Sequence, residues 1–270
     1  MINTKVILVT GGSSGIGYEA AQRLARMGHK VYAAARRTAL MEPLVADGVT
    51  PLALDVTDDA SRRQCVDTIL KAEGRIDVLV NNAGYGYFGA VEGVPPDDAR
   101  RQLEVNVFGL AEMTRLVLPA MRSQRSGRIV NIASIAGRAV FPFGGWYNVS
   151  KYSVEALSDA LRMELKPFGI TLTAVLPGDT KTGFTAARQK IDDPEDLYGG
   201  RIERSVQRME CDEQHGVPAQ KVGDLIARVA LKRRVKPLYI PGFSYNLVNV
   251  LMRLLPSGAA NKLIGMLYAK

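Results

Sequence analysis

One glycine-rich stretch decides the fold of this chain: Thr10-Gly11-Gly12-Ser13-Ser14-Gly15-Ile16-Gly17. It follows an apolar strand candidate at residues 6–10 and opens a helix candidate at residues 16–27. Glycines allow a tight turn and a close backbone approach to a pyrophosphate, and the helix N-terminus offers unpaired N–H groups to the same anion. The pattern therefore predicts a dinucleotide-binding loop formed by Gly11, Ser13, Ser14, Gly15, Ile16 and Gly17.

Downstream of this stretch, apolar runs alternate with helix-period segments almost to the end of the chain. Strands are predicted at residues 6–10, 31–35, 50–54, 78–81, 128–133, 171–176 and 237–240. Helices are predicted at residues 16–27, 58–72, 97–122 and 147–168, the second of them capped by Thr57. Because parallel strands joined by helices need right-handed crossovers, the expected fold is α/β: a Rossmann-type doubly wound parallel sheet of about seven strands with helices on both faces.

The chain length fits one domain. Its 270 residues suffice for an α/β domain with a full core, and we predict a single dinucleotide-binding and catalytic domain over residues 1–270. The polar segment 183–218 is predicted to be a substrate lid. The apolar segment 243–270 is predicted to pack on the domain or on a second subunit. Charges and a proline interrupt it, so it cannot span a membrane, and contact with a membrane surface is less favoured than packing.

Charge and composition narrow the classes of partner. The net charge is +8, but no pattern of interleaved aromatic and basic residues accompanies it, so nucleic-acid binding is not expected. No metal site is expected either, because Cys65 and Cys211 lack ligand-like spacing and His29 and His215 have no metal-like partner nearby. No N-terminal targeting signal is visible, and we expect a cytoplasmic protein.

The residues after the second strand indicate which dinucleotide is bound. An NAD site of this type usually offers a carboxylate there to the ribose 2′-hydroxyl. This chain has Ala35-Arg36-Arg37 instead. Because a guanidinium group donates paired hydrogen bonds to a phosphate, Arg36 and Arg37 predict NADP(H) rather than NAD(H).

Three residues form a catalytic pattern. Tyr147 and Lys151 are four residues apart in a helical segment, so they share one helix face, and Ser134 ends the fifth predicted strand. A nearby ammonium group and an oxidised, positively charged nicotinamide are both expected to lower the pKa of the Tyr147 phenol toward the range of a general acid or base. The hydroxyl of Ser134 is expected to hold the substrate oxygen against Tyr147.

With these motifs the chain resembles the short-chain dehydrogenase/reductase family, in its compact rather than its extended branch. The resemblance covers residues 5 to 182. It rests on the glycine-rich stretch and on Asp55-Val56, Asn81-Asn82-Ala83-Gly84, Asn106, Ser134, Tyr147-Asn148-Val149-Ser150-Lys151 and Pro177-Gly178-Asp179-Thr180-Lys181-Thr182. The glycine spacing and the chain length argue against the extended branch, such as a sugar-nucleotide epimerase.

The resemblance implies a role for each matched position. Asp55 and Val56 would hold the adenine, and Asn82, Ala83 and Gly84 would lie on the adenosine ribose side. Lys151 would also bind the nicotinamide ribose hydroxyls, and Asn106 would anchor a water for proton relay through its main chain. The remaining cofactor contacts are expected from Pro177, Gly178, Thr180 and Thr182. The resemblance also implies a homodimer or homotetramer formed through the helix that carries Tyr147.

Aromatic residues suggest the class of substrate. Phe141, Trp146 and Phe184 are predicted to line an apolar pocket, which favours a steroid-like, retinoid-like or acyl-like compound. Because cells keep NADP mainly reduced, reduction of a carbonyl group is the expected direction. The alternative is a non-catalytic NADPH-binding sensor or scaffold, and the intact set of Ser134, Tyr147 and Lys151 argues against it.

Overall fold

A seven-stranded parallel sheet forms the centre of the computed structural model, which describes residues 4–191 and 197–268. The strand order is β3-β2-β1-β4-β6-β7-β11, and every neighbouring pair is parallel. The strands are β1 Val6–Thr10, β2 Lys30–Ala35, β3 Val49–Ala53, β4 Val78–Asn81, β6 Gly127–Ile132, β7 Ile170–Val175 and β11 Leu238–Tyr239. The predicted Rossmann-type α/β fold is confirmed, with differences of only one or two residues at the strand ends.

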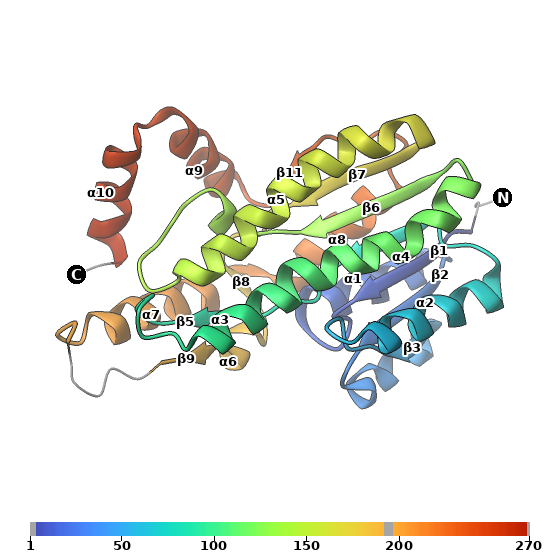
Figure 1. Cartoon of the computed structure of the whole chain (residues 1–270), viewed down its shortest axis with the longest axis horizontal. Helices are drawn as coiled ribbons and strands as arrows, with labels where there is room; N and C mark the ends of the chain where they lie inside the picture. The colour runs from blue at the N-terminus through green and yellow to red at the C-terminus, as the bar shows by residue number, and fades with distance from the viewer. Residues whose placement is uncertain (1–3, 192–196, 269–270) are drawn as a thin grey trace.

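Helices cover both faces of this sheet (Figure 1). On one face, α1 (Gly15–Arg26) and α8 (Ala219–Leu231) bury their apolar sides against alternate residues of the strands. On the other, α2 (Asp59–Glu73), α4 (Leu110–Ser123) and α5 (Gly145–Leu165) enclose a second core. Because both faces are buried, β1 and β4 are apolar along nearly their whole length.

Helices α1 and α8 approach each other closely at Gly223. A Cβ atom at this position would lie 2.6 Å from Cβ of Glu19 and 2.9 Å from the backbone nitrogen of Ala20. The backbone cannot yield as a flexible side chain does, so the two helices would have to move apart.

We therefore expect Gly223→Ala to lower the free energy of unfolding by about 1–3 kcal/mol and Tm by roughly 2–10 °C. Thermal unfolding measures this, with Gly265→Ala as the matched control. Gly265 is also helical but has open space around its Cβ position, so alanine there should stabilise by up to about 1 kcal/mol. Equal effects of the two substitutions would refute the close approach.

The helix predicted over residues 97–122 is interrupted. It consists of α3 (Pro96–Leu103), a π-helical turn at Glu104–Gly109, and α4. The wider turn contains Asn106, whose buried side chain bonds to a neighbouring loop and to α5 rather than pointing along the helix. The cap of α2 also differs from the prediction. The side chain of Asp58 accepts the hydrogen bond from the N–H of Ser61, whereas the hydroxyl of Thr57 donates to Asp55.

The segment predicted as a lid contains short elements that lie beside the carboxyl edge of the sheet. Its residues 192–196 fall outside the described part. The chain also forms β5 Tyr87–Phe88, β8 Thr180–Lys181, α6 Phe184–Ala187, β9 Gln189–Lys190, α7 Arg201–Gln214 and β10 Val217–Pro218. Strand β9 pairs with β5, and β10 pairs with β8. Short 3-10 helices lie at Thr38–Asp47, Ile135–Gly137 and Lys166–Phe168.

Two helices end the described chain: α9 (Phe243–Leu254) and α10 (Ser257–Tyr268). They project beyond the sheet at the end where α7 lies (Figure 1). Ile264 of α10 is buried, while α9 contains no buried residue. The packing predicted for this segment, on the domain or on a second subunit, stays a prediction. Within the described residues, no helix combines the length and the hydropathy needed to cross a bilayer.

Candidate active site

A cavity of about 980 Å³ opens at the carboxyl edge of the sheet, where the strand order turns from β1 toward β2 on one side and β4 on the other. Ligands of doubly wound sheets bind at this switch point. Most of the predicted site residues line the cavity together. They are Gly11, Ser13, Ser14, Gly15, Ile16, Arg36, Arg37, Asp55, Val56, Asn82, Ala83, Gly84, Ser134, Phe141, Tyr147, Lys151, Pro177, Gly178, Thr180, Thr182 and Phe184.

The glycine-rich loop is held by the segment that follows β4. The side-chain amide of Asn82 donates to the carbonyl oxygens of Thr10 and Gly11, both at 3.1 Å. In return, the hydroxyl of Thr10 accepts from the backbone N–H groups of Asn82 and Ala83 at 3.0 and 3.1 Å. This exchange fixes the loop before any ligand arrives, so Asn82 supports the loop as well as lining the cavity.

Three glycines in and after the loop, Gly11, Gly15 and Gly17, have steric reasons for their positions. Gly11 and Gly15 have φ of 66° and 58°, in the left-handed region that other residues avoid. Gly17 does not line the cavity; a Cβ there would lie 2.5 Å from the carbonyl oxygen of Gly11. A Cβ on Gly15 would lie 3.2 Å from Cβ of Thr182, so the loop and the segment after β7 face each other across the N-terminus of α1.

Two exposed arginines follow β2 and line the same cavity. Within the part of the chain that the structure describes, the side chain of neither Arg36 nor Arg37 forms an ion pair or a hydrogen bond. Nearby, burial disfavours the charged form of Asp55, but hydrogen bonds from the N–H and hydroxyl of Thr57 and the positive charges of Arg36 and Arg101 lower its pKa overall. Arg101, which the sequence did not single out, also lines the cavity.

The hydroxyl of Ser134 lies beside the phenol of Tyr147 and acts to lower the pKa of that phenol. Ser134 follows β6 and caps the next 3-10 turn, where its hydroxyl oxygen accepts from the N–H of Ala136 at 3.1 Å. Tyr147 lies in the first turn of α5. Burial raises the pKa of Tyr147 to about 12, against the lowering effect of Ser134. In the chain by itself the pKa is therefore raised rather than lowered, and the phenol is protonated at neutral pH; the lowering by an oxidised nicotinamide stays a prediction.

Lys151 is the second buried member of this helix face. Its ammonium nitrogen lies 5.6 Å from the centre of the Tyr147 ring and donates to the carbonyl oxygen of Ile132 at 3.1 Å. Burial lowers the pKa of Lys151 from 10.5 to about 8. The ammonium group therefore loses its proton much more readily than an exposed lysine does.

Asn106 does not line the cavity, but its side chain forms hydrogen bonds that connect two parts of the site. Its amide oxygen accepts from the N–H of Tyr85 at 3.0 Å, and its nitrogen donates to the carbonyl oxygen of Tyr85 at 2.9 Å and to the hydroxyl of Ser150 at 3.1 Å. Asn106 thus ties the loop after β4 to α5, one residue before Lys151. The water that the family resemblance implies at its main chain remains a prediction.

Aromatic rings surround Tyr147. The rings of Phe88 and Phe184 have their centres 5.5 and 5.8 Å from that of Tyr147, and Phe141 stacks on Phe88 at 6.1 Å. Trp146, the third predicted substrate residue, is not among the residues that line the cavity. It adjoins Tyr147 in α5, and successive helical residues point about 100° apart, so the two side chains face different directions.

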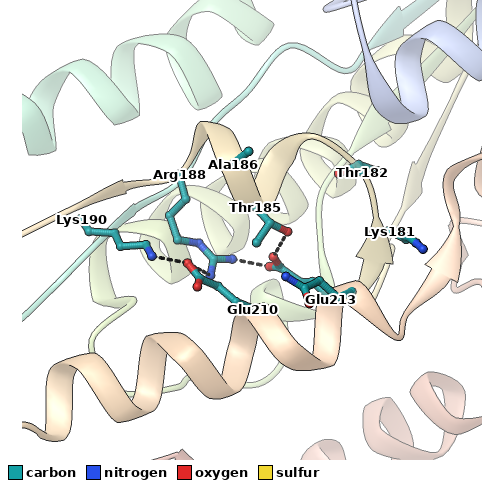
Figure 2. Close-up of a pocket in the computed structure, with 9 residues that line it drawn as sticks. Lys181, Thr182, Thr185, Ala186, Arg188, Lys190, Glu210 and Glu213 are labelled. Carbon is teal, nitrogen blue, oxygen red and sulfur yellow. Dashed lines mark hydrogen bonds and ion pairs between the residues drawn. The ribbon is translucent and has the colours of Figure 1, made fainter.

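A buried arginine that the sequence did not single out lies between this cavity and a smaller one of about 450 Å³ (Figure 2). The side chain of Arg188 is only 1% exposed, pairs with Glu213 and lies 4.2 Å from the centre of the Phe88 ring. Figure 2 shows Glu213 also accepting from the hydroxyl of Thr185, while Lys190 pairs with Glu210. Burial raises the pKa of Glu213, and the charges of Glu213 and Arg188 both act on Tyr147.

A further unpredicted pair closes the cavity near Gly178. The hydroxyl of Tyr245, on α9, donates to the carboxylate of Asp179 at 2.7 Å. Burial raises the pKa of Asp179 despite this bond. The pair connects the Pro177–Thr182 segment to the C-terminal helices, a long-range contact that no local pattern in the sequence reveals.

Over residues 4–191 and 197–268, no three acidic, histidine or cysteine residues are grouped as metal ligands would be.

Comparison with known proteins identifies relatives of this chain both in sequence and in fold. A family profile described as short chain dehydrogenase matches residues 5–193. A protein of Bacteroides thetaiotaomicron named 3-ketodihydrosphingosine reductase is 39% identical over 232 residues, which cover 85% of this chain and 84% of the relative.

Two solved structures match most of the fold. A short-chain dehydrogenase from Streptomyces avermitilis is 31% identical, with a TM-score of 0.84 over 93% of this chain and 92% of that one. A short-chain dehydrogenase/reductase from Burkholderia phymatum, solved in complex with NAD, is 26% identical, with a TM-score of 0.81 over the same shares.

Proposed function

We propose, since the chain belongs to the short-chain dehydrogenase family, that it is an NADP(H)-dependent reductase of a carbonyl group on a hydrophobic small molecule. It is an oxidoreductase of a family that acts on alcohol and carbonyl groups. One observation carries the finer proposal. A single cavity joins the glycine-rich loop with Arg36 and Arg37, the Ser134–Tyr147–Lys151 set, and a wall of apolar side chains.

The loop and the two arginines fit a phosphorylated dinucleotide. Because Gly11, Gly15 and Gly17 carry no side chains, the N-terminus of α1 stays open to a pyrophosphate. The free N–H groups and the helix dipole stabilise such an anion there. At the end of β2, Arg36 and Arg37 offer positive charge where an NAD site usually offers a carboxylate. Arg36 and Arg37 would hold the 2′-phosphate of NADP(H). Asp55 and Thr182 line other parts of the same cavity.

The chemistry divides between cofactor and protein. When bound, NADPH supplies the hydride for the carbonyl carbon. Tyr147, protonated at neutral pH, donates its proton to the substrate oxygen, and Ser134 orients that oxygen by a hydrogen bond. Lys151 holds a positive charge beside the Tyr147 ring, which favours the phenolate left after the proton has moved.

The apolar wall favours a long, lipid-like ketone. Beyond Phe88, Phe141, Phe184 and Met209, the wall continues over the C-terminal helices, with Val248, Leu251, Met252, Leu263, Ile264, Leu267 and Tyr268. Such a length of apolar lining suits an acyl-like chain better than a compact polar substrate. The name of the Bacteroides thetaiotaomicron relative, 3-ketodihydrosphingosine reductase, supports a ketone substrate.

Cofactor titration tests the proposal. We expect Kd for NADPH to be at least about tenfold below that for NADH, equivalent to about 1.4 kcal/mol. The double variant Arg36→Ala/Arg37→Ala should lose this preference through weaker NADPH binding, with NADH binding within about threefold of the original. Arg100→Ala, an exposed arginine outside the cavity, is the control. A preference for NADH in the unmodified protein would overturn the cofactor assignment, and binding of neither would favour the sensor or scaffold.

We also propose a homodimer or homotetramer formed through α5. This helix exposes Val149, Tyr152 and Met163, and Phe108 is exposed on the neighbouring π-helical turn. Exposed apolar side chains on adjacent helices are typical of subunit interfaces. Light scattering of the purified protein should give two or four times the mass of one chain, and a monomer would refute this proposal.

A further inference from the structure

Helix α9 presents an apolar stripe to solvent. Phe243, Leu247, Val250 and Leu254 are all exposed, and Phe243 and Leu254 reach 88% and 77%. Their spacing of four, three and four residues places them on one side of the helix. Side chains of this size at this exposure are unusual in a row on a protein surface.

The opposite side of α9 is apolar as well. Tyr245, Val248 and Met252 line the large cavity, so this side faces the proposed substrate. A narrow polar strip with Asn246, Asn249 and Arg253 separates the two apolar sides. A helix with two apolar sides normally lies between two apolar environments. In the part of the chain that the structure describes, α9 has only one, the cavity.

The cavity opens onto the apolar stripe. Leu251 on α9 and Leu267 on α10 both line the cavity, and yet they are 38% and 59% exposed. They therefore form part of its rim. Met266, beside Leu267, is also exposed and extends the apolar surface onto α10. A molecule that enters between these rim residues passes over the same surface that the stripe forms.

The charged residues of the C-terminal segment itself have one sign. Residues 241–270 contain three basic residues, Arg253, Lys262 and Lys270, and no acidic residue. Arg253 and Lys262 are exposed. A face of exposed apolar residues bordered by basic residues is complementary to a bilayer that contains anionic lipids.

We propose that the surface of α9 and α10 docks on an anionic lipid bilayer, and that the substrate enters the cavity from the bilayer between Leu251 and Leu267. The second part rests on the proposed function; the docking itself does not. A second copy of the chain fits this surface less well. A two-fold contact would bring the basic residues of both copies together with no acidic partner in residues 241–270, and it would cover the cavity rim.

Vesicle flotation tests the docking. Purified protein is mixed with vesicles of phosphatidylcholine alone or with about one third phosphatidylglycerol. We expect strong co-flotation with the anionic vesicles and weaker co-flotation with phosphatidylcholine. The variant Phe243→Ser/Leu254→Ser should bind the anionic vesicles at least tenfold more weakly. Val45→Ser/Val91→Ser, which removes two exposed apolar side chains elsewhere, should bind within twofold of the unmodified protein.

A second readout separates docking from entry. With NADPH, the Phe243→Ser/Leu254→Ser variant should reduce a short water-soluble ketone at the normal rate, and a long-chain ketone held in anionic vesicles at least tenfold more slowly. A normal rate on the vesicle-bound ketone would overturn entry from the bilayer. Vesicle binding without reduction of any ketone would refute the proposed function and leave the docking supported. Absence of co-flotation with the anionic vesicles would overturn the docking. If the variant also changed from dimer to monomer, the surface would be assigned to contact between copies.

Discussion

Replacing Tyr147 by phenylalanine is expected to slow carbonyl reduction by about 10²–10⁴-fold while leaving the Kd for NADPH almost unchanged. The substitution removes only the hydroxyl that lies beside Ser134 and donates the proton. The ring stays, so the packing against Phe88 and Phe184 is retained and the fold should not be disturbed. The loss should therefore appear in kcat rather than in stability.

Single-turnover measurement with a hydrophobic ketone and NADPH gives the effect directly. Tyr152→Phe is a suitable control, since Tyr152 lies on the same helix, loses the same hydroxyl and does not line the cavity. Ser134→Ala should produce a smaller loss than Tyr147→Phe, because it removes an orienting hydrogen bond but not the proton donor. If Tyr147→Phe reduced the ketone within threefold of the unmodified rate, Tyr147 would not be the proton donor.

The pH dependence of reduction should report Lys151. Burial lowers the folded-state pKa of Lys151 to about 8, whereas that of Tyr147 is about 12. Below pH 8 both groups carry their protons, and kcat/KM for the ketone should be flat. As the pH rises through 8, Lys151 loses the charge that favours the phenolate. We expect kcat/KM to fall about tenfold per pH unit, or roughly 100-fold by pH 10.

Two substitutions of Lys151 test whether the fall of kcat/KM around pH 8 comes from this residue. Lys151→Met should be slow at every pH and show no fall centred at 8. Lys151→Arg keeps a positive charge at all these pH values, so its profile should stay flat to pH 10 even if the larger side chain lowers the rate. An alkaline fall that persists at pH 8 in both variants would have to be assigned to another group.

The sheet was predictable because its strands are buried on both faces. Such strands leave continuous apolar runs in the sequence, as in Val6–Thr10 and Val78–Asn81, and glycines mark several helix ends. The edge strand β11 is the least regular, and the structure shortens it to Leu238–Tyr239. The glycine-rich loop and the Tyr147–Lys151 spacing were also readable, because each is set within one turn or one helix.

Features that depend on distant contacts were not readable. Arg188 lies in a polar stretch without periodicity, and only the fold brings it beneath Phe88 and beside Glu213. Tyr245 meets Asp179 across 66 positions of sequence. The raised pKa of Tyr147 in the chain by itself was not readable either, because the spacing shows that Lys151 is near but does not show how deeply the phenol is buried.

The pairing of α1 with α8 has a consequence for how the chain folds while the ribosome synthesises it. The apolar side of α1 is covered in large part by Val222, Ile226 and Ala230, which the ribosome adds roughly 200 residues after α1 itself. At typical elongation rates this interval lasts about 10–40 s. The nascent N-terminal portion therefore waits with an uncovered helix face while its partner is still being translated. During that wait the uncovered apolar side of α1 is a surface on which aggregation can begin and to which a chaperone can bind.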